Sequence, residues 1–128
     1  MTSSIKSRSD YGESTVQYVL LVPVVLLVLI VAIQLTTYFH AATIAAHAAT
    51  RGAGAASRAG RTNVDGLAEA QRVVVESGAE FIDGSVAGDS EIEARIKVRV
   101  IRLVPFFPSS VSRRAVVPKE RVVLEAER

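Results

Sequence analysis

The chain has 128 residues, of which 49% are hydrophobic, with no cysteine and a formal net charge of +2. This length allows one small domain beside an anchor, and the lack of cysteine excludes disulfides, thiol nucleophiles and thiolate metal sites. The charge is too small and the arginines are too scattered to indicate a nucleic-acid partner.

A polar leader, residues 1–12, precedes an uncharged apolar segment that runs from Val16 to Phe39. A helix that crosses a membrane needs about 20 consecutive apolar residues, and in lipid a helix satisfies its own backbone polar groups. We therefore expect this segment to span a membrane. Lysine and arginine nearly balance on its two sides, so the positive-inside rule does not give the orientation.

Several residues interrupt the apolar segment. Pro23 lacks a backbone N–H, so we expect it either to kink the helix or to lie in the first turns, where that donor is spare. Gln17, Gln34 and the pair Thr36-Thr37 lie near the two ends. This placement indicates solvation at the membrane interface; the alternative is that Gln17 makes a hydrogen bond to another helix in an assembly.

An alanine-rich stretch, residues 40–58, continues the helix beyond the membrane, because alanine has the highest helix propensity. Gly52 and Gly54 weaken this stretch. Its small residues allow close approach by another helix, and the sequence leaves open whether that contact is with another subunit or with the chain's own domain. The candidate packing residues are Ala48, Ala49, Gly52 and Ala53.

A second helix is expected from a cap at Asn63 or Asp65 to about Ser77. One of its faces is predicted to be apolar. The residues of that face are Leu67, Ala70, Val74 and Val75.

The region 91–100 alternates strictly between apolar and charged residues, which predicts a strand with one buried face. The alternation slips at Ile101 and Leu103, and this slip indicates a bulge or a twist near Val100. Further short strands are expected at residues 81–86, 115–117 and 122–124.

The predicted fold class is α+β, with a long N-terminal transmembrane helix followed by a second helix and a small antiparallel sheet. The chain would divide into a polar leader (1–12), a transmembrane and extended Ala-rich helix (13–60) and a small soluble α+β domain (61–128).

A set of N-terminal features resembles the TadE/TadG-like family, the pseudopilins of tight-adherence (Flp) pilus systems. These features are Gly12, the triplet Val16-Gln17-Tyr18, Pro23 and the Ala/Gly block at residues 48–55. In that family a glycine precedes the mature N-terminus, a Val-Glu-Phe-like triplet follows, and a proline lies inside a Leu/Val-rich helix. The resemblance covers residues 12 to about 58, and the chain departs from the family at Gln17, where the family has glutamate.

The resemblance implies a minor pseudopilin of a Flp, type IVb-like pilus, cut after Gly12 by a prepilin peptidase so that Glu13 becomes the first residue. It also implies an assembly motif made of Val16, Gln17, Tyr18 and Pro23. The implied partners are the membrane, the prepilin peptidase and other pilus-assembly subunits, namely pilins, TadG- and TadF-like proteins and the secretion platform. The implied location is the bacterial cell membrane, in a single pass and in association with a pilus, with the C-terminal domain outside the cytoplasm.

Two other functions compete with this one. The chain could be an unprocessed, single-pass, membrane-anchored envelope scaffold or binding module. It could instead be a conventionally secreted protein cut at the A-x-A match Ala46-His47-Ala48, although that site lies far beyond the apolar core.

No catalytic, cofactor-binding or metal-ligating residue is predicted, and an enzyme is not expected. His40 and His47 are seven residues apart, whereas zinc ligands on a helix usually lie four apart. No phosphate-binding loop is present in the sequence either.

Overall fold

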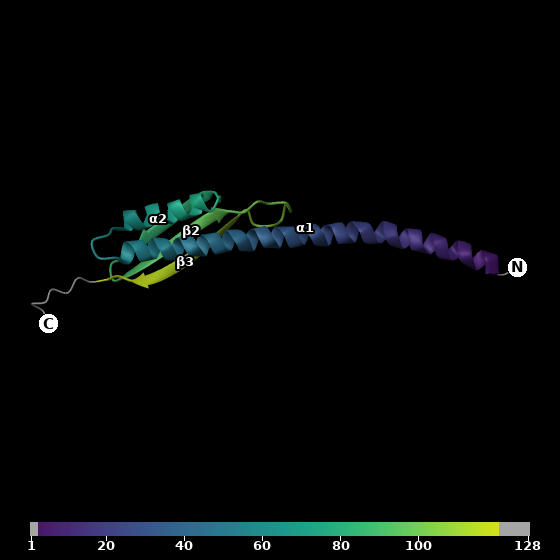
Figure 1. Cartoon of the computed structure of the whole chain (residues 1–128), viewed down its shortest axis with the longest axis horizontal. Coiled ribbons are helices and arrows are strands. Elements are labelled where there is room, and N and C mark those ends of the chain that lie inside the picture. The colour runs from purple at the N-terminus through teal and green to yellow at the C-terminus, as the bar shows by residue number, and fades with distance from the viewer. Residues whose placement is uncertain (1–2, 121–128) are drawn as a thin grey trace, which may run out of the picture.

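The computed structural model describes residues 3–120, with side chains described from Ser14 onward. In chain order, this part contains α1 (Ser3–Ser57), α2 (Asn63–Glu76), β1 (Phe81–Ala87), β2 (Glu91–Arg99) and β3 (Ser110–Pro118). Figure 1 shows α1 as a long, gently curved helix, with α2 and the sheet gathered along its C-terminal half. The N-terminal half of α1 extends away from this domain. The fold is α+β with a long helix first, as predicted.

The helix α1 is continuous over 55 residues. It begins at Ser3, within the polar leader, rather than at residue 13, because a helix once formed gains one hydrogen bond for each residue that it adds. Pro23 lies in the interior of α1, so its placement in a first turn is wrong. The helical backbone passes through Pro23 without a break.

The helix α2 begins with a capping box. The hydroxyl of Thr62 accepts a hydrogen bond from the backbone N–H of Asp65, and the carboxylate of Asp65 accepts one from the backbone N–H of Thr62. The cap is therefore Thr62, not Asn63 or Asp65, and Asp65 completes it from the third helical position. At the other end, Ser77 is the C-cap, as the sequence indicated.

The buried face of α2 differs in part from the predicted one. Val75 is 67% exposed, whereas its neighbour Val73 is buried. The buried residues of α2 follow the spacing of a single helical face; they are Gly66, Ala70, Val73 and Val74.

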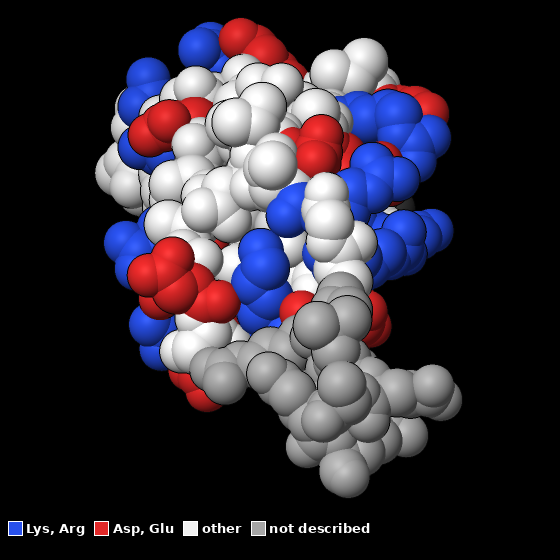
Figure 2. Space-filling model, turned by 90° about the vertical axis from the view of Figure 1, so that its left-hand side faces the viewer, with Lys and Arg blue, Asp and Glu red and all other residues white. Residues whose placement is uncertain are grey.

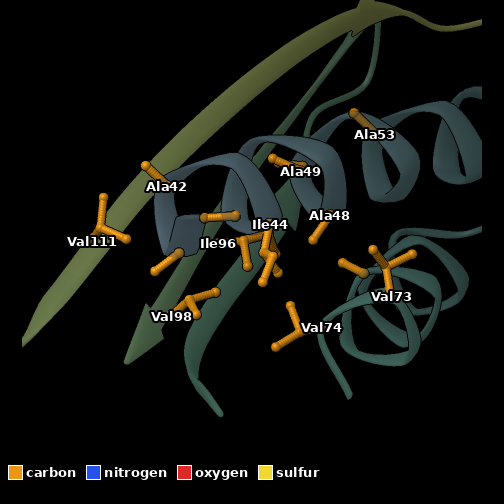
Figure 3. Close-up of a cluster of buried hydrophobic side chains, with 14 of the residues drawn as sticks. Ala42, Ile44, Ala48, Ala49, Ala53, Val73, Val74, Ile96, Val98 and Val111 are labelled. Atoms are coloured by element: carbon orange, nitrogen blue, oxygen red, sulfur yellow. The ribbon is translucent and has the colours of Figure 1, made fainter. Parts of the chain in front are cut away.

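The sheet is antiparallel and has the order β1-β2-β3. The alternation predicted for β2 is confirmed, since its apolar residues Ile92, Ala94, Ile96 and Val98 are fully buried. Both helices pack on this buried face of the sheet, and β2 lies between β1 and β3. Figure 3 shows Ile96 and Val98 of β2 lying close to Ile44 of α1 and Val74 of α2 in the core.

The strand boundaries correct the rest of the sequence-based prediction. No bulge occurs near Val100, because β2 ends at Arg99 and the chain leaves the sheet. The irregularity in strand pairing lies instead in β1, between Phe81 and Asp83. The strand expected at 115–117 is part of the longer β3, and the strand expected at 122–124 lies outside the described residues.

The packing of α1 on α2 depends on two glycines. A Cβ atom added to Gly66 would lie 2.6 Å from the carbonyl oxygen of Gly52, and one added to Gly52 would lie 2.9 Å from the carbonyl oxygen of Gly66. Neither distance leaves room for a side chain, so the two backbones can approach this closely only with glycine at both positions. The small residues of α1 here pack on the chain's own domain.

Candidate functional site

The N-terminal half of α1 exposes large apolar side chains in an unbroken series. Val19, Leu20 and Leu27 are 63–66% exposed, and their neighbours on every side of the helix are exposed as well. A soluble helix buries an apolar stripe and turns a polar face to water, but residues 14–33 offer no polar face. Exposed apolar surface of this extent marks a membrane or protein contact.

The length of this exposed segment fits a bilayer. At 1.5 Å per residue, residues 14–33 extend over about 30 Å, which is about the thickness of the hydrocarbon core. Among the described residues, the stretch Ser14–Ser57 is one helix that is long and apolar enough to cross a membrane.

The predicted site residues fall into two separate groups. Val16, Gln17, Tyr18 and Pro23 are exposed on the N-terminal half of α1. Gly12 and Glu13 precede them on the same helix, and the side chain of Glu13 is outside the described residues.

The second group lies far along α1 from the first. It consists of small residues that are buried in the domain core beside α2 and the sheet: Ala48, Ala49, Gly52 and Ala53.

Sequence reasoning missed the role of Gln34. Its side chain is fully buried, rather than solvated at a membrane interface. The amide Nε2 donates to the carbonyl oxygen of Ile101 at 3.1 Å, and Oε1 accepts from the backbone N–H groups of Leu103 at 2.6 Å and Val104 at 3.2 Å. The signal in the sequence was weak: a single glutamine near the end of the apolar segment, before the alanine-rich stretch.

Those three hydrogen bonds hold the loop that joins β2 to β3. The loop is closed at its base, where the backbone N–H of Val100 donates to the carbonyl oxygen of Ser109 at 2.9 Å. Val104 is buried against the domain, while Ile101, Leu103 and Phe106 are exposed. In Figure 1 this loop is the part of the domain that reaches farthest toward the exposed half of α1.

A pocket of about 490 Å³ lies beside this loop, between α1 and the adjoining end of the domain. Its lining is mostly apolar, with Ile44 and Ile101 among the residues, and its charged members Arg99 and Glu80 form an ion pair at 3.2 Å. His40 also lines it, together with Thr36, Thr37 and Ser77, whose hydroxyls each donate to a backbone carbonyl oxygen of their own helix. Among the described residues, no group of three or more histidine, aspartate or glutamate side chains could hold a metal ion.

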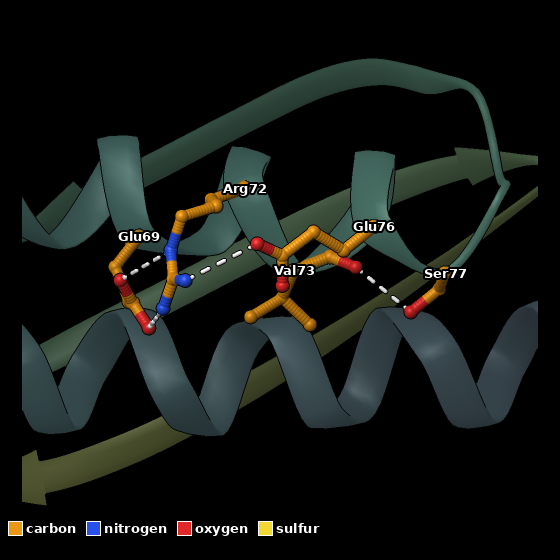
Figure 4. A network of polar contacts seen from close by, with 5 residues as sticks. All are labelled: Glu69, Arg72, Val73, Glu76 and Ser77. Atoms are coloured by element: carbon orange, nitrogen blue, oxygen red, sulfur yellow. Dashed lines mark hydrogen bonds and ion pairs between the residues drawn. The ribbon is translucent and has the colours of Figure 1, made fainter.

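The outer surface of α2 carries a small ionic network, shown in Figure 4. The guanidinium of Arg72 pairs with Glu69 at 2.6 Å and with Glu76 at 3.2 Å. The hydrogen bond from Arg72 lowers the pKa of Glu69. These groups face solvent, where such pairs contribute little to stability. The network is therefore typical of a solvated helix surface and not of a reactive site.

The end of the domain opposite the exposed helix carries charged side chains of both signs (Figure 2). Figure 2, which looks onto the end of the molecule opposite the exposed helix, shows basic side chains gathered along one side with acidic side chains among them. Both signs are present on this face, which fits a hydrated domain surface.

The apolar half of α1 is a candidate membrane-spanning helix, and Gly12 lies just before it on the same helix. The family model described as TadE-like protein matches residues 12–54. The match begins at Gly12 and ends among the buried small residues of α1. This match confirms the resemblance to the TadE-like family over that segment; α2 and the sheet lie beyond it. No curated protein and no solved structure matches the chain significantly.

Proposed function

We propose that the chain is a TadE-like minor pseudopilin, a structural and assembly component of a tight-adherence (Flp, type IVb-like) pilus that a prepilin peptidase cuts after Gly12. One observation carries this proposal: the TadE-like match begins at residue 12, and directly beyond it α1 exposes a bilayer length of apolar helix. The family and the exposed helix both support a structural role for the chain rather than catalysis.

The cleavage step depends on Gly12. Proteases bind their substrates in extended form, and α1 passes through residue 12 as a helix, so a turn must unwind before cutting. Glycine is about 1 kcal/mol less favourable than alanine inside a helix, which lowers the cost of that unwinding. Glycine also places no side chain in the way of the protease. Cleavage here would leave Glu13 as the first residue.

The exposed half of α1 would serve two functions in turn. In the membrane, residues 14–33 are the anchor. In a pilus-associated assembly, the same apolar surface would pack against the helices of pilins and of TadG- or TadF-like subunits, guided by the motif of Val16, Gln17, Tyr18 and Pro23. The domain that contains α2 and the sheet would lie on the other side of the membrane from the leader, outside the cytoplasm.

At residue 17 this chain has glutamine where the family has glutamate. In pilin-like proteins the glutamate at this place is thought to pair with the free N-terminal amine during assembly. An amide can accept a hydrogen bond from that amine but cannot neutralise its charge, and charge-assisted pairs are about twice as strong as neutral ones. Glu13 would be the carboxylate nearest to the new amine. A weaker attachment of this kind suits a subunit that primes or caps a pilus.

The test is co-expression with a prepilin peptidase and measurement of intact mass. The wild-type chain should lose the mass of residues 1–12, and a Gly12→Leu variant should keep it. A Gly54→Leu variant is the control, because it makes the same change in the same helix away from the cleavage point. If the wild-type chain stays in the membrane uncut, the chain is an unprocessed envelope scaffold or binding module.

A further inference from the structure

The loop between β2 and β3 carries apolar side chains that its own domain leaves uncovered. Ile101 is 70% exposed, Leu103 is 53% exposed and Phe106 is 85% exposed. Single exposed apolar residues are common on protein surfaces, but three within one short loop that also contains Pro105 form a local apolar tip. This tip is not part of the segment on which the TadE-like match rests.

The loop is held at a fixed level on α1. Gln34 binds the carbonyl oxygen of Ile101 and the backbone N–H groups of Leu103 and Val104. Both polar ends of a fully buried amide are used in these bonds, so the loop cannot slide along the helix without leaving buried polar groups unpaired. Where Gln34 lies relative to the membrane therefore decides where the loop lies.

Gln34 directly follows the exposed apolar half of α1. Residues 14–33 extend over about the thickness of the hydrocarbon core, so Gln34 falls where the hydrocarbon ends and the headgroups begin. In Figure 1 the loop projects from the domain toward the exposed half of the helix. The apolar tip is thus continuous with the lipid-facing surface of α1 and at the same depth as the membrane interface.

We propose that the β2–β3 loop inserts its apolar tip, formed by Ile101, Leu103 and Phe106, into the interface of the bilayer that α1 crosses. Phenylalanine and leucine are typical of elements that lie in the boundary between headgroups and acyl chains. Arg102 is exposed between Ile101 and Leu103, where its long side chain can reach lipid phosphates while its neighbours stay in the apolar layer. The loop gives the domain a second membrane contact and fixes its tilt over the bilayer.

This inference rests on the proposed function only in that α1 must be the membrane anchor. It is tested with a single tryptophan, since the chain contains none. The full chain with Phe106→Trp is placed in vesicles of phosphatidylcholine and phosphatidylglycerol, with or without bromine on the acyl chains. The control is Val64→Trp, which replaces an apolar residue of similar exposure, 75%, at the start of α2 and the opposite end of the domain.

Bromine quenches tryptophan only at short range, so we expect the brominated lipid to quench the Phe106→Trp chain several-fold more than the Val64→Trp chain. Equal quenching of the two, in a chain that resists alkaline extraction from the vesicles, overturns the loop insertion and leaves the anchor intact. A blue-shifted emission at position 106 that bromination does not alter also overturns it, because the loop then contacts protein. A chain that alkaline washing removes contradicts both the loop insertion and the proposed anchor.

Discussion

The side-chain oxygen Oε1 of Gln34 accepts a 2.6 Å hydrogen bond from the backbone N–H of Leu103, 69 residues later in the chain. Gln34 lies on α1 where the exposed apolar half ends, and Leu103 lies in the loop between β2 and β3 that reaches toward that half (Figure 1). The bond therefore joins α1 to the loop at this end of the domain. A displacement of α1 would carry the domain with it through this contact.

Replacing Gln34 with leucine should release the loop. The variant Gln34→Leu removes the partner of the Leu103 and Val104 amides, and a typical intramolecular hydrogen bond contributes about 1 kcal/mol to stability. Hydrogen exchange reports such local opening residue by residue. We expect exchange at Leu103 and Val104 to become several-fold faster or more. The matched control is Gln17→Leu, which should leave both amides unchanged, and equal protection in the two variants would show that Gln34 does not hold the loop.

Replacing Gly66 with alanine should destabilise the domain. The added Cβ would lie 2.6 Å from the carbonyl oxygen of Gly52 and from the Cβ of Ala56, so α1 and α2 must move apart. Overpacking of this kind typically costs about 1–3 kcal/mol. Thermal unfolding of the detergent-solubilised chain, followed by circular dichroism, should show a lower midpoint.

Gly54 provides the control for that change. A Cβ at Gly54 meets nothing within 4 Å, so Gly54→Ala gains helix propensity of roughly 0.5–1 kcal/mol without a clash. Its midpoint should stay the same or rise. Midpoints that fall equally in Gly54→Ala and Gly66→Ala would contradict the close approach of the two helices.

The capping box of α2 should give stability that acid removes. Hydrogen bonds from the backbone and hydroxyl of Thr62 lower the pKa of Asp65. A carboxyl whose pKa is lower in the folded state than in the unfolded chain stabilises the fold at pH values above its unfolded-state pKa. This stabilisation is lost as the pH falls through the folded-state pKa. The advantage of the wild-type chain over Asp65→Asn should therefore be full near pH 7 and decline below about pH 4.

The hydroxyl of Thr62 should matter at every pH, in contrast to the carboxylate of Asp65. Thr62→Ala removes the N-cap and should lower the free energy of unfolding by about 1 kcal/mol. Denaturant unfolding near pH 7 and below about pH 4 compares Thr62→Ala and Asp65→Asn with the wild-type chain. If the difference between the wild-type chain and Asp65→Asn is the same at low and neutral pH, the box does not act through the ionised carboxylate.

The sequence predicted the elements whose pattern is local. Alternation from Glu91 onward predicted β2 and its buried face, and the run of uncharged residues predicted the exposed helix. Contacts between distant parts of the chain were not predictable in this way. Whether Val73 or Val75 turns inward depends on how α2 is rotated against α1, and the close contact of Gly52 with Gly66 joins residues that are far apart in the sequence.

The same limit decides which features of the β2–β3 loop and of the candidate site could be predicted from the sequence. The slip in alternation near Val100 indicated a bulge or a twist, but β2 ends at Arg99 and hydrogen bonds from Gln34 hold the loop that follows. Gly12, Gln17 and Pro23 could be recognised because they are arranged within one short segment. Gln34 could not, because its partners lie in a loop whose position only the folded chain defines.

The most direct test of the proposed function is the N-terminus and intact mass of the protein recovered from the cells that make it. Cleavage by a prepilin peptidase predicts a chain that begins at Glu13 and keeps residues 14–33. A chain that still carries Lys6 and Arg8 would contradict the proposed maturation and leave a permanently anchored envelope protein. A chain that begins near Thr50, without the exposed helix, would contradict the anchor as well.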